Sequence, residues 1–126
     1  MHSPINPPGY PVHPFYSQAV EVNASGRTLY VSGQYGIGAD GNIPADIESQ
    51  TRNTLANMVN VLAAGGMTPA DVVKYTIYLT DTADMDAFTS TAAESLPQPP
   101  PATTLVFVKA LAAPQMRVEI EAVAVQ

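Results

Sequence analysis

Two carboxylates near the end of the chain are the side chains best suited to chemistry. Glu119 and Glu121 fall on one face of a predicted strand over residues 116–125, because successive side chains of a strand point to opposite faces. The other face of this strand is apolar and carries Val118, Ile120 and Ala122. Carboxyl groups placed in a sheltered site serve as general acids or bases. What these two carboxylates face is therefore the first question that the sequence raises.

A second predicted strand, residues 101–108, comes just before and has no polar face. Its two faces carry Thr104, Val106 and Val108 on one side, and Thr103, Leu105 and Phe107 on the other. Two predicted helices can cover one face of a sheet but not both. An apolar face that its own chain leaves uncovered indicates a partner subunit. We therefore predict a homo-oligomer.

The remaining elements follow from periodicity, turn residues and caps. Residues 1–15 hold five of the twelve prolines, so we expect an irregular N-terminal arm. Asp46 is the predicted N-cap of a first helix, which Gly65-Gly66 ends. The other predicted elements are strands 16–22 and 28–34, paired as a hairpin, then strand 72–80 and helix 85–95. With the two C-terminal strands, this β-β-α-β-α-β-β order predicts a single α+β domain over residues 1–126.

Composition excludes several classes of function. The net charge is −6 and the five basic residues are scattered, whereas nucleic-acid binding depends on clustered Lys and Arg, so we predict no nucleic-acid partner. The chain has no Cys and two His, which argues against disulfides and a zinc site. No apolar run is long enough to cross a membrane, and residues 1–4 do not resemble a signal peptide. We expect a soluble, cytoplasmic protein without a metal.

Five segments occur in the order and spacing of one family. They are Tyr16-Ser17-Gln18-Ala19-Val20, Val31-Ser32-Gly33-Gln34, Gln50-Thr51-Arg52-Asn53-Thr54-Leu55-Ala56-Asn57, Asp71-Val72-Val73-Lys74-Tyr75-Thr76 and Val118-Glu119-Ile120-Glu121-Ala122. In them the chain resembles the RidA family, also called YjgF/YER057c/UK114 or, in older labels, endoribonuclease L-PSP. The resemblance implies a chorismate-mutase-like fold with two helices on one face of a mixed sheet. It also implies a homotrimer whose subunits meet through the other face around a central barrel.

The resemblance also implies a reaction. Well-known members hydrolyse enamines and imines such as 2-aminoacrylate to a keto acid and ammonia, without a cofactor, in clefts between subunits. By this resemblance Glu121 orients or activates water and Tyr16 closes the pocket. Ser32 and Gly33 match the family's site residues, and the resemblance also places Thr103, at the position of the family's Arg, and the following Thr104 and Leu105 at the substrate. The alternative for Glu121 is that it only hydrogen-bonds backbone groups in the interface between subunits.

The departures from the family pattern gather around this pocket. Thr103 stands where the family has the Arg that grips the substrate carboxylate, and a hydroxyl group cannot replace a charged, two-pronged donor. With Leu105 beside it, we expect a pocket with apolar walls next to Glu121. Arg117 remains a candidate for the missing cation, the alternative being a salt bridge. The segment His13-Pro14-Phe15-Tyr16 is one residue longer than the family's Gly-Pro-Tyr, and its His13 is either a new acid or base or a solvent-exposed side chain.

Three hypotheses follow. The first is a hydrolase or deaminase of the RidA type, acting on an enamine, imine or related small molecule with altered specificity because Thr103 replaces the Arg. The second is a non-catalytic trimer that binds a ligand or acts as a chaperone. The third is the ribonuclease activity of the older family name, and the net charge of −6 argues against it.

Overall fold

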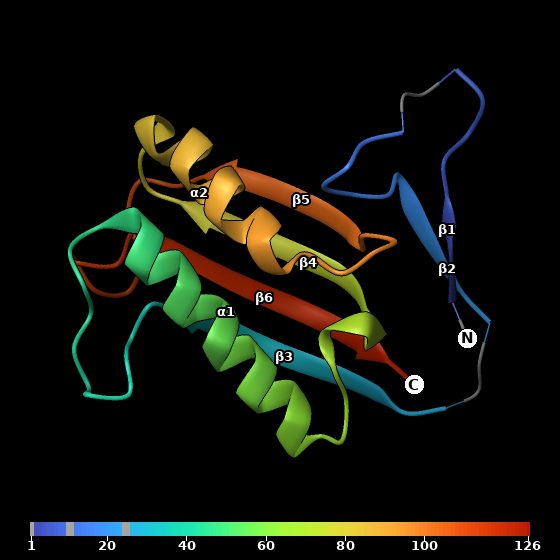
Figure 1. Ribbon diagram of the computed structural model, residues 1–126, viewed down its shortest axis with the longest axis horizontal. Coiled ribbons are helices and arrows are strands. Elements are labelled where there is room, and N and C mark those ends of the chain that lie inside the picture. Colours follow the sequence, from blue (N-terminus) through green and yellow to red (C-terminus); the bar gives the residue numbers. More distant parts are fainter. Residues whose placement is uncertain (1, 10–11, 24–25) are drawn as a thin grey trace.

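A four-stranded sheet with two helices on one face forms the body of the molecule (Figure 1). The computed structural model describes residues 2–9, 12–23 and 26–126. The strand order is β3-β6-β4-β5, with β5 parallel to β4 and β6 antiparallel to both of its neighbours. The strands are β3 (Thr28–Tyr35), β4 (Val72–Leu79), β5 (Ala102–Phe107) and β6 (Val118–Val125). The predicted α+β class and the predicted elements of this sheet are confirmed.

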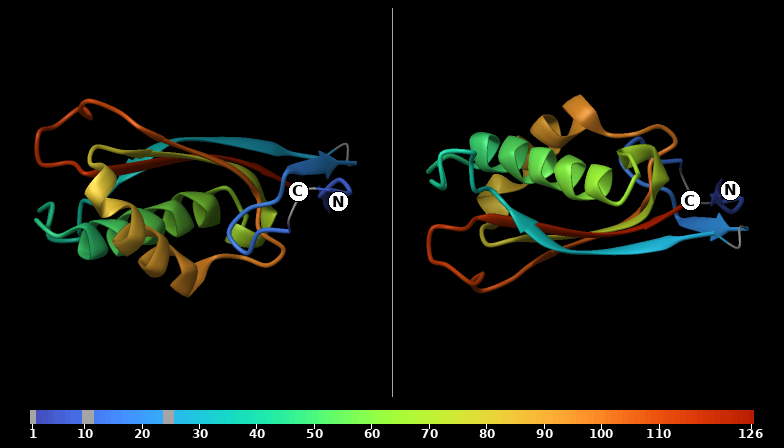
Figure 2. Two further views of the ribbon diagram at one scale, coloured as in Figure 1. Left: turned by 90° about the horizontal axis from the view of Figure 1, so that it is seen from above. Right: turned by 90° about the horizontal axis from the view of Figure 1, so that it is seen from below.

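The helices are α1 (Ile47–Ala64) and α2 (Met85–Ala92), and both views of Figure 2 show them on the same side of the sheet. Asp46 is the N-cap of α1, because its side chain accepts a hydrogen bond from the backbone N–H of Ser49 (2.8 Å). Gly66 has a φ of +74°, a conformation that favours glycine, and ends the helix as predicted. The predicted helix 85–95 is shorter than expected, since residues 93–95 form a 3-10 turn.

Strand β6 lies at the centre of the sheet, and its alternation is the one that the sequence predicts. The side chains of Val118, Ile120, Ala122 and Ala124 are buried beneath the helices. Glu119 and Glu121 point to the opposite face, which carries no helix (Figure 2). Burial of apolar area at about 25 cal/mol per Å² makes the first face the main source of stability.

Gln50 of α1 ties the helix layer to the start of β6, although it is a polar residue that is completely buried. Its Nε2 donates to the carbonyl oxygens of Pro44 (2.8 Å) and Gln115 (2.9 Å). Its Oε1 accepts from the backbone N–H of Arg117 (2.9 Å). Because each polar atom of the amide has a partner, its burial costs little and it orders the loop that leads into β6.

The predicted hairpin of strands 16–22 and 28–34 is wrong. Strand β2 (Ala19–Val22) instead pairs antiparallel with β1 (His2–Ile5), and the two form a small separate sheet at one end of the body (Figure 1). The arm over residues 1–15 is therefore not wholly irregular, because it contains a strand. Strand β3 pairs with β6, which buries its apolar face under α1. Local patterns specify strands, but long-range burial decides their partners.

Candidate active site

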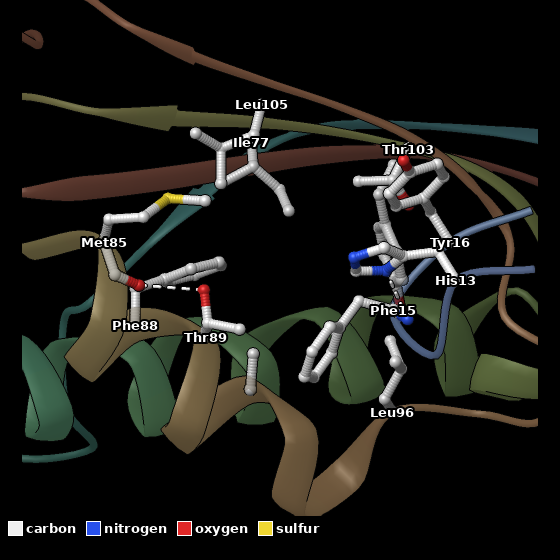
Figure 3. A pocket seen from close by; sticks show the side chains of 12 residues that line it. His13, Phe15, Tyr16, Ile77, Met85, Phe88, Thr89, Leu96, Thr103 and Leu105 are labelled. Atoms are coloured by element: carbon white, nitrogen blue, oxygen red, sulfur yellow. Dashed lines mark hydrogen bonds between the residues drawn. The ribbon is translucent and has the colours of Figure 1, made fainter. Parts of the chain in front are cut away.

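A cavity of about 250 Å³ lies between α2, strands β4 and β5, and the segment that precedes β2 (Figure 3). Apolar side chains make up most of its wall. It is lined by His13, Phe15, Tyr16, Tyr75, Ile77, Met85, Phe88, Thr89, Ala92, Leu96, Thr103 and Leu105. Within the part of the chain that the structure describes, no Asp, Glu, Lys or Arg side chain lines the cavity. Such a space suits a small ligand with an apolar body.

The register of the parallel pair β4–β5 sets one wall of this cavity. Tyr75 is paired with Thr103 and Ile77 with Leu105, so all four side chains share the helix-covered face. The opposite wall comes from α2, which contributes Phe88 and three other residues. Strand faces and helix stripes thus supply the apolar lining by ordinary periodicity.

The segment that closes the end of the cavity is held to the start of β5 through Ser17. The backbone N–H of Ser17 donates to the carbonyl oxygen of Pro101 (3.1 Å), and its hydroxyl donates to that of Pro100 (2.5 Å). A further hydrogen bond joins the side-chain amide of Gln98 to the carbonyl oxygen of Pro14 (3.4 Å). These contacts place Tyr16 against the sheet, where the resemblance predicts that it closes a pocket.

Three of the predicted site residues meet in this cavity. Tyr16, Thr103 and Leu105 all line it, and Figure 3 shows their side chains together with those of α2. The hydroxyl of Thr103 donates to the carbonyl oxygen of Pro101 (3.2 Å), so its proton is already engaged within the chain. Ala92 of α2 adds another apolar surface.

The other predicted site residues lie on the uncovered face of the same sheet. Ala122 is paired with Tyr75, which is paired with Thr103, so Glu121 must point away from Thr103. Thr104, next along β5, accepts a hydrogen bond from Lys74 Nζ (2.7 Å) on this uncovered face. Within one chain Glu121 therefore does not lie beside Thr103 and Leu105, and the predicted proximity of these residues stays a prediction about a cleft between subunits. Strand parity separates them.

Ser32 and Gly33 belong to the uncovered face as well, at an irregularity in the pairing of β3 with β6. A Cβ atom on Gly33 would lie 2.1 Å from the carboxylate Oε2 of Glu119. Gly33 therefore leaves room for the Glu119 side chain, which a larger residue would displace. Ser32 is exposed.

Two tyrosines of β4 show how differently the two faces treat an ionisable group. Burial in the helix-covered layer raises the pKa of Tyr75 to about 12. On the uncovered face, a hydrogen bond from the hydroxyl of Tyr78 to the carboxylate of Glu121 raises the pKa of Tyr78. The structure thus gives Glu121 a phenol as its hydrogen-bond partner.

Arg117 does not supply the missing cation to the cavity. Its Nη2 lies 2.6 Å from Oδ1 of the buried Asp84, and its Nε lies 3.1 Å from Oδ2. A third donor, Nη1, is bonded to the carbonyl oxygen of Ala45 (2.9 Å). The guanidinium is therefore committed to an ion pair, which decides between the two predicted alternatives.

His13 is the cavity residue whose place the sequence left open. It is half-buried, and its ring stacks on that of Tyr16 with centroids 4.5 Å apart and an angle of 20° between the planes. Its Nδ1 accepts a hydrogen bond from the backbone N–H of Phe15 (3.1 Å). The only sequence signal is its position in the segment 13–16, which is one residue longer than the corresponding family motif.

Among the described residues, no group of three or more His, Cys, Asp or Glu side chains is arranged to hold a metal ion. No helix within that part of the chain is long and apolar enough to span a bilayer.

Residues 10–126 match the family model described as endoribonuclease L-PSP. The chain belongs to this family. A relative from Dermatophagoides farinae, named 2-iminobutanoate/2-iminopropanoate deaminase, is 35% identical, with 99% of this chain and 94% of the relative covered. The mitochondrial protein mmf2 of Schizosaccharomyces pombe is 38% identical, with 88% and 87% covered.

A crystal structure of a Rid-family protein of unknown function from Yersinia pestis has the same fold. It superposes with a TM-score of 0.85 at 39% identity, covering 99% of this chain and 98% of that one. The predicted membership in the RidA family and the predicted fold are therefore confirmed.

Proposed function

We propose that this protein hydrolyses small imines or enamines to the carbonyl compound and ammonia. Water adds to the imine carbon, and the resulting carbinolamine releases ammonia as the carbonyl double bond forms. Family membership and the relatives named 2-iminobutanoate/2-iminopropanoate deaminase support this type of reaction. The cavity lined by Tyr16, Thr103 and Leu105 receives the apolar substituent of the substrate.

The observation that carries the specificity is the absence of a charged side chain from the lining of this cavity in the described residues. An Arg holds a carboxylate with two parallel charged hydrogen bonds, and such bonds contribute about 1.5–3 kcal/mol each. Thr103 offers one neutral hydroxyl, whose proton is engaged by Pro101. Imino acids therefore bind more weakly here than in relatives that have the Arg.

The reaction further requires an assembly, because Glu121 and Thr103 lie on opposite faces of the sheet. We propose a homotrimer in which the uncovered face of one subunit lies at the cavity of its neighbour. Glu121, positioned by Tyr78, then orients the attacking water. Exposed side chains on the uncovered face support this assembly, among them Tyr30 (79% exposed) and Val106 (40% exposed).

The cytoplasm remains the compartment that we predict. Two relatives from Schizosaccharomyces pombe, mmf1 and mmf2, are named as mitochondrial proteins.

A trapping assay tests the reaction. Imines are generated from amino acids by an amino-acid oxidase and from amines by an amine oxidase, and semicarbazide captures what is not hydrolysed. The wild-type protein should lower trapping of at least one amine-derived imine, and Glu121→Gln should abolish this effect. Thr103→Arg should increase hydrolysis of imino acids by roughly tenfold or more, through the restored charged contact.

If neither the wild type nor Thr103→Arg lowers trapping of any imine, the protein is not a hydrolase of this kind. Binding of a ligand without turnover would then favour the alternative, a non-catalytic ligand-binding or chaperone-like trimer.

A further inference from the structure

A hydrogen bond from the backbone shows which nitrogen of the His13 imidazole carries the proton. Nδ1 accepts from the N–H of Phe15 (3.1 Å), so it carries no proton and the proton is on Nε2. Stacking on Tyr16 fixes the plane of the ring. Figure 3 shows the ring reaching into the cavity, with Nε2 at its leading edge.

This Nε2–H differs from every other polar group of the cavity. The hydroxyl protons of Thr89 and Thr103 are given to the carbonyl oxygens of Met85 (2.8 Å) and Pro101 (3.2 Å). The phenols of Tyr16 and Tyr75 can each donate or accept. Nε2–H can only donate, and it has no hydrogen-bond partner among the described residues. It therefore selects a ligand atom that accepts.

We propose that His13 anchors the ligand through this Nε2–H, and that the cavity takes uncharged carbonyl or imine compounds with one apolar substituent. The proposal rests on the proposed function for the class of reaction, and it adds the binding residue and the substrate class. His13 thus serves as the polar anchor in a cavity whose lining, among the described residues, includes no Lys or Arg. A ligand carboxylate buried there would lose its hydration without gaining a charged partner, which favours a neutral carbonyl or imine compound.

The size of the cavity limits the substituent. An apolar cavity of about 150 Å³ accommodates benzene. The space of about 250 Å³ therefore admits one aromatic ring, or an aliphatic chain of similar bulk, together with the reacting group. The surrounding side chains of Phe88, Leu96 and Leu105 give such a ring apolar contacts on several sides.

Two probes and two variants test the inference without any turnover. Acetophenone and phenylglyoxylate share the ring and the ketone, and they differ in a methyl group against a carboxylate. His13→Asn keeps an oxygen that can accept from the N–H of Phe15, in the manner of an Asx turn, but loses the donor into the cavity. His13→Gln retains a side-chain N–H at about the reach of Nε2.

Dissociation constants from calorimetry or NMR titration should favour acetophenone over phenylglyoxylate for the wild type. His13→Asn should weaken acetophenone binding by about 2- to 12-fold, the range for one neutral hydrogen bond, and His13→Gln should retain most of the affinity. The chain has two His, so long-range proton–nitrogen spectra of a His2→Gln background report His13 alone. Acetophenone should shift Nε2 and leave Nδ1 unprotonated.

The inference is wrong if phenylglyoxylate binds as tightly as acetophenone, if neither probe binds, or if His13→Asn and wild type bind acetophenone equally. It is also wrong if His13→Gln binds as weakly as His13→Asn. These outcomes are separate from failure of the proposed function. A protein that binds acetophenone through His13 but hydrolyses no imine would refute the reaction and leave the binding site standing.

Discussion

The two faces of the sheet carry different kinds of side chain. On the covered face, β4 and β5 present Tyr75, Ile77 and Leu105 to an apolar cavity under α2. On the uncovered face, the same strands and β6 carry hydrogen-bonded polar pairs, namely Tyr78 with Glu121 and Lys74 with Thr104. The apolar cavity lies on the covered face, and the carboxylate of Glu121 points away from it. The predicted site residues are thus divided between two faces of the sheet, and the proposed trimer would bring them together.

The largest effect that this comparison predicts is on assembly. Val106 and Phe107 are neighbours on β5 with nearly equal exposure, 40% and 42%, but they lie on opposite faces. Val106→Asp should dissociate the oligomer, because it would place a carboxylate in a desolvated interface. Phe107→Asp should leave it intact. Light scattering distinguishes the two outcomes, and a wild type that is a monodisperse monomer would refute the predicted assembly altogether.

A smaller effect is expected on folding stability. Val118 is completely buried under the helices, whereas Val123 of the same strand lies on the uncovered face. Val118→Ala should lower the free energy of unfolding by about 2 kcal/mol, from two lost methylene equivalents and a cavity. Val123→Ala should cost about 0.5 kcal/mol or less in the isolated chain. Denaturant unfolding measures both.

If Val123→Ala costs as much as Val118→Ala in the assembled protein, but not in the Val106→Asp background, a neighbouring subunit covers Val123. Equal costs in both backgrounds would show that the two faces of the sheet do not differ in burial within one chain.

The smallest effect concerns the alkaline titration of β4. The pKa of Tyr75, about 12, and that of Tyr78 both lie above the unfolded value of about 10. Their contribution to stability is therefore fully present below pH about 10 and is lost as the pH rises through the folded values. The hydrogen bond to the Glu121 carboxylate is the main cause of the raised pKa of Tyr78. Glu121→Gln should therefore lower the pKa of Tyr78 and leave that of Tyr75 unchanged.

Ultraviolet absorbance of the phenolates measures this titration, with Tyr75→Phe and Tyr78→Phe assigning the two steps. If Glu121→Gln leaves the pKa of Tyr78 unchanged, the result would contradict the hydrogen bond between Tyr78 and Glu121.

Much of the fold could be predicted from local sequence, and the reason is physical. The cap at Asp46, the glycine pair that ends α1 and the alternation of β6 each depend on residues a few positions apart. The predicted hairpin of strands 16–22 and 28–34 is wrong, because β3 pairs with β6 and these segments are about ninety residues apart in the chain. No local pattern records which of two competing partners buries more apolar surface.

The candidate site was predicted in part. Tyr16, Thr103 and Leu105 do share a cavity, and the sequence identified all three. The sequence allows two roles for His13, because the direction of its ring depends on tertiary contacts. These are the hydrogen bond from Phe15 to Nδ1 and the stacking on Tyr16. The sequence likewise allows two roles for Arg117, and the structure shows that its guanidinium forms an ion pair with Asp84.

The sequence by itself determined which residues share a strand face, where the helices begin and end, and that position 103 carries a Thr hydroxyl and no charge. These are consequences of a period of two along a strand, of capping chemistry and of residue identity. Only the tertiary structure decided that the helices cover the face of Thr103 and leave that of Glu121 open. Which face is covered depends on how helices and strands far apart in the chain bury apolar area together.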